Sequence, residues 1–136
     1  MNRLFLALLL LTLAMPAAAY NVAVRHVYDG DTILVVDAAL PAPLKNLSVR
    51  LRGIDTPELR GQCQAEKDKA LLAKNYLKSV VGKNQNITLT HYKWDKYGGR
   101  IDAAVSLDGV DLSTILIAAG YAVAYNGTGT RKDWCN

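Results

Sequence analysis

The stretch from residue 47 to residue 58 reads LSVRLRGIDTPE and carries the strongest structural signal in the chain. Apolar and polar side chains alternate over Leu47–Ile54, which predicts a half-buried strand with Arg50 on its polar face. The proline that follows Asp-Thr ends the strand, because a residue before proline is restricted to extended or turn conformations. We therefore expect a strand that delivers two carboxylates, Asp55 and Glu58, at its end.

Outward from this strand, the sequence predicts a small domain of mixed structure. Four more strands are indicated by alternation and β-branched content, at Tyr20–Tyr28, Thr32–Val36, Asn86–Trp94 and Arg100–Leu107. Apolar residues at helical spacing predict a long helix over Gln64–Val81 and a short one over Leu112–Ala119, each followed by glycine. The charged residues of the long helix, Glu66 among them, are expected on a solvated face. The expected fold is α+β, a five-stranded OB-type β-barrel with one long helix after strand 3 and a short C-terminal helix.

Residues 1–19 differ in composition from the rest of the chain and predict a signal peptide. They hold one charge, Arg3, and an apolar run from Leu4 to Leu13 that is too short to span a bilayer comfortably. An Ala-Ala-Ala segment offers a cleavage site after Ala19, the alternative being an uncleaved anchor. Without this segment the net charge falls from +4 to +3, which does not by itself argue for nucleic acid. We expect one domain over residues 20–136, exported to the periplasm or secreted, without stable membrane association and monomeric.

The chain has two cysteines, Cys63 and Cys135. Because an oxidising compartment favours disulfides, the export signal predicts that they pair with each other, the alternative being two free thiols. A zinc site is disfavoured, since two thiolates with distant histidines do not make a zinc spacing pattern.

Two acidic clusters point to a metal. Asp29 and Asp31 flank a hairpin turn, and Asp55 and Glu58 end the strand described above together with Arg50. Each cluster also has a plain structural interpretation, as a turn or as surface ion pairs. Carboxylates repel phosphate, however, so acids beside arginine at one site suggest a hard divalent cation held by carboxylate and backbone oxygens.

A third cluster, residues 94–100, reads WDKYGGR. Basic residues interleaved with aromatic ones suit single-stranded nucleic acid, because cations follow the phosphates and rings stack on the bases. The plain alternative is a hairpin with ordinary surface residues.

The three clusters together resemble the staphylococcal nuclease family. The resemblance lies in DGDT at 29–32, VRLRGIDTPE at 49–58 and DKYGGR at 95–100, and it spans about Val22 to Tyr125. The Trp134-Cys135 ending is similar to that of short exported bacterial members. The resemblance implies an OB-type barrel and Ca²⁺-dependent cleavage of DNA and RNA that leaves 3′-phosphate ends. The alternative is a noncatalytic OB-type module that binds nucleic acid.

The resemblance also implies a role for each matching residue. Calcium ligands are expected from the carboxylates of Asp31 and Asp55 and from the carbonyl of Thr56, with Asp29 close by. Three residues are expected to act on the scissile phosphate: Glu58 as general base, and Arg50 and Arg100 as clamps. Substrate contacts are expected from Lys96, Tyr97 and Tyr125.

Two departures from the family pattern bear on these roles. Gly98 and Gly99 make the third motif one glycine longer than usual, so a bulge is needed to keep the direction of Arg100. The loop over residues 59–62 is short and lacks the lysines of the prototype. We expect a Cys63–Cys135 bridge to tie this loop to the tail, which then forms one wall of the groove.

Overall fold

The computed structural model describes residues 18–37, 39, 45–82, 86–96 and 98–136. Most of the expected signal peptide and Tyr97 lie outside this part of the chain. The elements, in order, are β1 (Tyr20–Val27), β2 (Thr32–Val36), β3 (Asn46–Leu51), β4 (Ile54–Asp55), α1 (Gln64–Val81), β5 (Ile87–Trp94), β6 (Arg100–Leu107), β7 (Val110–Asp111), α2 (Leu112–Ala118) and β8 (Val123–Ala124).

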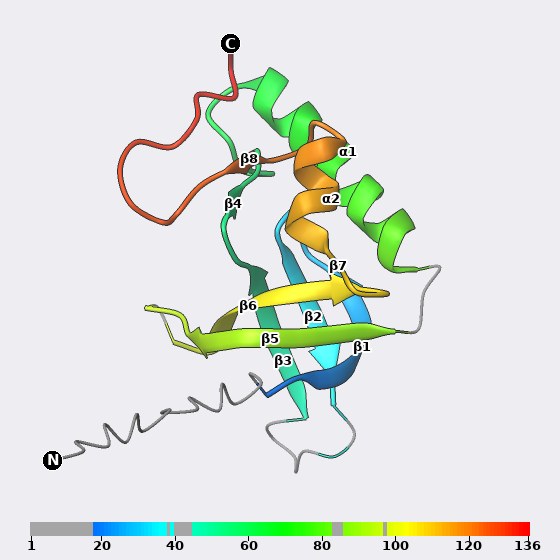
Figure 1. Cartoon of the computed structure of the whole chain (residues 1–136). Coiled ribbons are helices and arrows are strands. Elements are labelled where there is room, and N and C mark those ends of the chain that lie inside the picture. The colour runs from blue at the N-terminus through cyan, green and yellow to red at the C-terminus, as the bar shows by residue number, and fades with distance from the viewer. Residues whose placement is uncertain (1–17, 38, 40–44, 83–85, 97) are drawn as a thin grey trace, which may run out of the picture.

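The main sheet closes on itself. Its strand order is β3-β2-β1-β5-β6-β7, and β3 also pairs with β6. The β3–β6 pairing is parallel and all the others are antiparallel, so β1, β2, β3, β5 and β6 form a closed mixed barrel (Figure 1). This confirms the expected five-stranded OB-type α+β fold. Closure also leaves no long unpaired edge on the barrel strands.

The apolar side chains of each alternating strand point into the interior of the barrel. Val49 and Leu51 of β3 are fully buried, whereas Arg50 between them is half-buried on the outer side. The same alternation holds along β6, where Ile101 and Ala103 are buried. Arg50 therefore projects outward from the wall of the barrel, as its position in the alternating pattern predicts.

Helix α1 has the expected bounds and packs over one end of the barrel next to α2 (Figure 1). Its buried face is formed by Ala70, Ala73, Leu77 and Val81, which follow the expected helical spacing. The helix begins at Cys63, whose sulfur accepts a hydrogen bond from the Glu66 amide at 3.3 Å. The first turn of α1 is thereby placed beside the end of β4.

The expectation of one continuous strand over Leu47–Ile54 is wrong. The chain leaves β3 after Leu51, turns through Gly53 at φ +84°, and resumes as the two-residue strand β4. A positive φ of this size is open to glycine at no steric cost, so Gly53 permits the turn. β4 then pairs with β8 instead of the barrel.

The C-terminal tail, residues 125–136, returns to the start of α1. Cys63 and Cys135 form a disulfide with their Cα atoms 6.0 Å apart, as expected. In Figure 1 the tail is the red loop that swings out from β8 and comes back above β4. Among the residues that the structure describes, no helix is long and apolar enough to cross a bilayer.

Candidate active site

The turn between β1 and β2 carries Asp29 and Asp31. The Asp31 amide donates to Asp29 Oδ1 at 3.1 Å, which fixes the turn. A Cβ on Gly30 would lie 2.9 Å from the Ala73 side chain and 3.1 Å from Thr56 Cβ. Glycine is therefore what lets this turn pack against α1 and against the end of β4. The first two acidic clusters of the sequence meet at this contact.

Asp31 lies in a poorly solvated position. Burial, followed by the charge of Asp29, raises the pKa of Asp31 from its ordinary 3.8 to about 7, although Arg50 acts in the opposite direction. Arg50 Nη2 is 3.6 Å from Asp31 Oδ2, and the Thr32 hydroxyl donates to Oδ1 at 3.0 Å. The excess negative charge at Asp31 is the environment that a bound cation would relieve.

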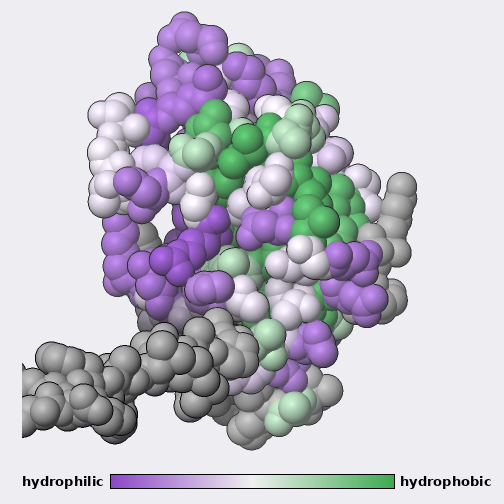
Figure 2. Space-filling view, viewed as in Figure 1, coloured by the Kyte–Doolittle hydropathy of each residue, from purple (hydrophilic) through white to green (hydrophobic). Residues whose placement is uncertain are grey.

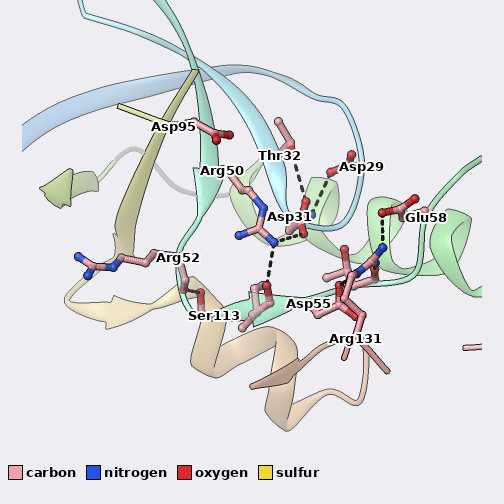
Figure 3. Close-up of polar contacts among 12 residues, drawn as sticks. Asp29, Asp31, Thr32, Arg50, Arg52, Asp55, Glu58, Asp95, Ser113 and Arg131 are labelled. Carbon is pink, nitrogen blue, oxygen red and sulfur yellow. Dashed lines mark hydrogen bonds and ion pairs between the residues drawn. The ribbon is translucent and has the colours of Figure 1, made fainter. Parts of the chain in front are cut away.

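Arg50 links the two acidic clusters. Its Nη2 also donates to the Ile54 carbonyl at 3.1 Å, so one guanidinium spans from the β1–β2 turn to β4 (Figure 3). Arg52, two residues on, points away from both clusters in the same view and donates to the His91 carbonyl at 3.1 Å. Of these two arginines, Arg50 is the one that lies at the acidic site.

Asp55 and Thr56 are buried at the end of β4, and among the described residues the hydrogen bonds to the Asp55 carboxylate come from the tail. Trp134 Nε1 donates to Asp55 Oδ2 at 2.9 Å, and Arg131 Nε donates to Oδ1 at 2.7 Å. Arg131 Nη2 also reaches the Thr56 carbonyl at 3.3 Å. Both expected metal ligands on this side of the site therefore contact one tail guanidinium.

Glu58 completes the set of oxygens around Arg131. Its side chain is 55% exposed, and Oε1 accepts from Arg131 Nη1 at 2.5 Å (Figure 3). Partial burial acts to lower the pKa of Arg131, but hydrogen bonds and charges from Asp55 and Glu58 outweigh it and raise the pKa above its ordinary value. Arg131 is a permanent cation in this position.

Glu66 is buried, which corrects the expectation of a solvated charge. Its carboxylate accepts from the amides of Glu58 and Gln62, both at 3.1 Å. A Cβ on Gly61 would lie 2.4 Å from this carboxylate, so a larger residue there would displace the Glu66 side chain from its present contacts. Glu66 thus holds the short loop after Glu58 in shape. Glu66 accepts from amides of the loop and not from the N-cap amide that a capping box would use, so this burial had no local signal in the sequence.

Arg100 lies at the start of β6 and pairs with Asp95. Its Nε donates to Asp95 Oδ2 at 2.6 Å. The two glycines between them both have positive φ, +71° and +67°, and the turn closes through the Asp95 amide on the Arg100 carbonyl at 2.9 Å. In the parallel β3–β6 register Arg100 faces Ser48, two residues before Arg50, so both arginines lie on the outer side of this strand pair.

The remaining expected contacts are spread around the site. Lys96 is exposed in the turn before β6, and Tyr97 is outside the described residues. The Tyr125 hydroxyl donates to the Gly129 carbonyl at 3.1 Å, which shapes the tail. Trp94, next to Asp95, is 64% exposed. The Tyr125 amide donates to the Gly53 carbonyl at 2.9 Å, so these two contacts join the residue to the tail and to the turn before β4.

The donor set around Arg131 fits a hard divalent cation. It consists of carboxylate oxygens and a backbone carbonyl, which are the ligands that Ca²⁺ takes. A cation, the guanidinium, is already held by three of these oxygens. Within the described residues, the group of three or more histidine, acidic or thiol ligand atoms that all lie within 4.8 Å of one another is that of Cys63, Glu66 and Cys135, and there both sulfurs are committed to the disulfide. The carboxylates of Asp31, Asp55 and Glu58 do not meet as closely as a set.

Sequence reasoning missed four contributors to the site: Glu66, Asp95, Arg131 and Trp134. Asp95 stands inside the third motif, but nothing in that motif predicts its pairing with Arg100. Arg131 and Trp134 lie 76 and 79 residues from Asp55, and no local pattern relates residues so far apart. The disulfide prediction was the one signal that placed the tail near this loop.

Comparison with known proteins identifies the class. The family of staphylococcal nuclease homologues matches residues 48–134. Two proteins from Escherichia coli O157:H7 and Escherichia coli, each named an uncharacterized endonuclease, are 28% identical to this chain over 125 residues, covering 90% of the chain and 74% of either relative. The chain belongs to the staphylococcal nuclease family, a class of nucleases that hydrolyse phosphodiester bonds.

Proposed function

We propose that this chain is an exported Ca²⁺-dependent endonuclease that cleaves DNA and RNA and leaves 3′-phosphate ends. The observation that carries the proposal is the convergence of Asp55, Thr56 and Glu58 oxygens on a single cation beside the Asp31 turn. A turn that merely faces solvent has no reason to gather a buried carboxylate, a carbonyl and a second acid around positive charge.

The arginines account for the reaction type. Attack on a phosphodiester builds negative charge on the phosphoryl oxygens, and guanidinium groups stabilise that charge through paired donors. Arg50 lies at the acidic site, and Arg100 lies on the same side of β3–β6. A bound divalent cation supplies further charge stabilisation there.

Glu58 has the properties of the proton acceptor. Its side chain is the most exposed of the acids held by Arg131, so it can meet a solvent water. The Glu58 amide donates to the Glu66 carboxylate. This contact holds the Glu58 backbone and so limits where its own carboxylate can lie. A general base of this kind contributes about 10²–10⁴-fold to a rate.

Export is part of the proposal and is supported by two features. The composition of residues 1–19 fits a signal peptide. The Cys63–Cys135 bridge suits an oxidising compartment. Expression of the full chain in bacteria, followed by mass measurement of the released protein, is expected to give a chain that starts at Tyr20.

The activity is tested with single-stranded DNA and RNA incubated with Ca²⁺, with Mg²⁺ and with chelator, while fragment sizes and end groups are followed. We expect cleavage with Ca²⁺ that falls about 10²-fold or more in Glu58→Gln and in Arg50→Ala. Arg52→Ala is the matched control, because Arg52 points away from the site. Intact DNA with retained binding under all metals would overturn the proposal in favour of a noncatalytic binding module.

A further inference from the structure

The tail is attached to the rest of the protein at both of its ends. β8 pairs with β4 at its start, Trp134 donates to Asp55 near its end, and the disulfide joins Cys135 to Cys63. Lys69 of α1 also donates to the Trp134 carbonyl at 2.7 Å. Figure 2 shows the tail as a hydrophilic arch with an opening between it and the body of the protein. The backbone of the tail is thus anchored on both sides of Arg131.

Within the part of the chain that the structure describes, Arg131 is held through its side chain. The guanidinium uses Nε, Nη1 and Nη2 to contact Asp55, Glu58 and Thr56 respectively. The side chain is 41% exposed, so solvent is adjacent. A long side chain of this kind can rotate into water while the anchored backbone stays in place.

Two of the three oxygens that bind Arg131, Asp55 Oδ1 and the Thr56 carbonyl, belong to residues expected to hold the divalent cation, and the third belongs to the neighbouring acid Glu58. A guanidinium and a divalent cation cannot share one set of ligands, because they would overlap and two positive charges a few ångströms apart repel strongly in a partly buried site. Trp134 occupies Asp55 Oδ2, so Oδ1 is the oxygen of that carboxylate for which the two cations compete.

We propose that Arg131 is a built-in competitor of the catalytic metal: it occupies the Asp55, Thr56 and Glu58 oxygens of the metal-free protein and must leave for the metal to bind. The inference rests on the proposed metal dependence of the function. Arg131 neutralises the acids while no metal is present and weakens the affinity for the metal by the free energy of its own contacts. The tail thereby sets the Ca²⁺ concentration at which the enzyme becomes loaded.

Calorimetric titration of the mature, disulfide-bonded protein with CaCl₂, without nucleic acid, tests the proposal. We expect Arg131→Gln to bind Ca²⁺ about 5- to 100-fold more tightly than wild type, which is the usual range of such coupling. Arg60→Gln is the matched control, because it removes the same charge from the exposed loop after Glu58 and is expected to change the affinity little. Arg131→Lys keeps the charge but lacks the planar guanidinium. Its Ca²⁺ affinity should lie between those of wild type and Arg131→Gln.

Limited trypsin digestion gives a readout in the unaltered protein. Trypsin needs an accessible arginine side chain, so Ca²⁺ is expected to speed cleavage after Arg131 while leaving cleavage after Arg60 unchanged. Tighter Ca²⁺ binding by Arg131→Gln supports the proposal. Unchanged or weaker binding overturns it and leaves the proposed nuclease function standing, provided that wild type binds Ca²⁺ and cleaves DNA. Absence of Ca²⁺ binding by wild type and Arg131→Gln alike, with no cleavage, overturns both.

Discussion

The two aspartates of this site, Asp31 and Asp55, have opposite kinds of surroundings. Asp31 lies in a turn of the barrel beside a second acid, and its nearest guanidinium, Arg50, is 3.6 Å away. Asp55 lies at the end of β4 with one oxygen on Arg131 at 2.7 Å and the other on Trp134 at 2.9 Å. One carboxylate has excess negative charge, and the other has both oxygens hydrogen-bonded.

The difference lies in which part of the chain supplies the partners. The barrel supplies Asp31 with neighbours that are close in sequence or in the sheet, and these leave its charge incompletely compensated. The tail supplies Asp55 with a cation and an indole N–H, and the disulfide keeps both in reach. The Asp31 side of the site is thus prepared for an added cation, whereas the Asp55 side already holds one.

The largest expected effect comes from removing the tail anchor. In Cys63→Ser/Cys135→Ser the unfolded chain regains the freedom of a loop with 72 residues of separation, so the free energy of unfolding should fall by about 4 kcal/mol. Urea unfolding of the two proteins measures this change. Hydrogen exchange is expected to quicken in the tail and at Asp55 while the Asp31 turn keeps its protection. Equal loss of protection at both aspartates would show that the two halves are not separately held.

Asp55→Ala should destabilise the metal-free protein by about 2–4 kcal/mol, because it leaves Arg131 short of a charge partner and the buried Trp134 N–H without an acceptor. Thermal unfolding in chelator is the measurement. Trp134→Phe is a useful companion, since it removes only the indole donor and should cost about 1 kcal/mol. If Asp55→Ala left the free energy of unfolding unchanged, the tail contacts would contribute nothing to stability.

Asp31→Asn should raise the free energy of unfolding, whereas Asp55→Ala lowers it, and the size of the gain should depend on pH. The pKa of Asp31 is raised to about 7 in the folded protein, so the folded state binds this proton more tightly than the unfolded chain does. The stability that this gives is complete below about pH 4 and is lost progressively up to about pH 7. In chelator, Asp31→Asn should therefore be more stable than wild type by about 1–3 kcal/mol at pH 8 and show little gain at pH 4.5. Melting curves at the two pH values decide this, and an equal gain at both would contradict it.

Much of the fold was predictable because it depends on local patterns. The bounds of α1 agree with the apolar spacing of the helix, and β2 and β6 agree with their alternation. The strand over Leu47–Ile54 was predicted too long. Its alternation continues through Gly53, and only the tertiary pairing of Ile54 with β8 shows that the chain has left the barrel.

The residues of the candidate site also fall into those with a local signal in the sequence and those without one. The arginine and acids of the VRLRGIDTPE stretch could be singled out, since they stand within nine residues of one another in the sequence. The burial of Glu66 had no local signal, because it depends on loop amides that fold back onto the first turn of α1. The partners of Asp55 had none, because hydrogen bonds between residues 76 and 79 positions apart leave no periodicity in the chain.

By itself, then, the sequence determined the barrel strands, the long helix and the set of acids and arginines, because alternation, helical spacing and turn chemistry act over a few residues. The tertiary structure decided how those charges are balanced. Barrel closure placed Arg50 and Arg100 on one side of β3–β6, and the disulfide-anchored tail brought Arg131 to Asp55, Thr56 and Glu58. Charge interactions depend on distance in space and on burial, and both of these exist only once the chain has folded.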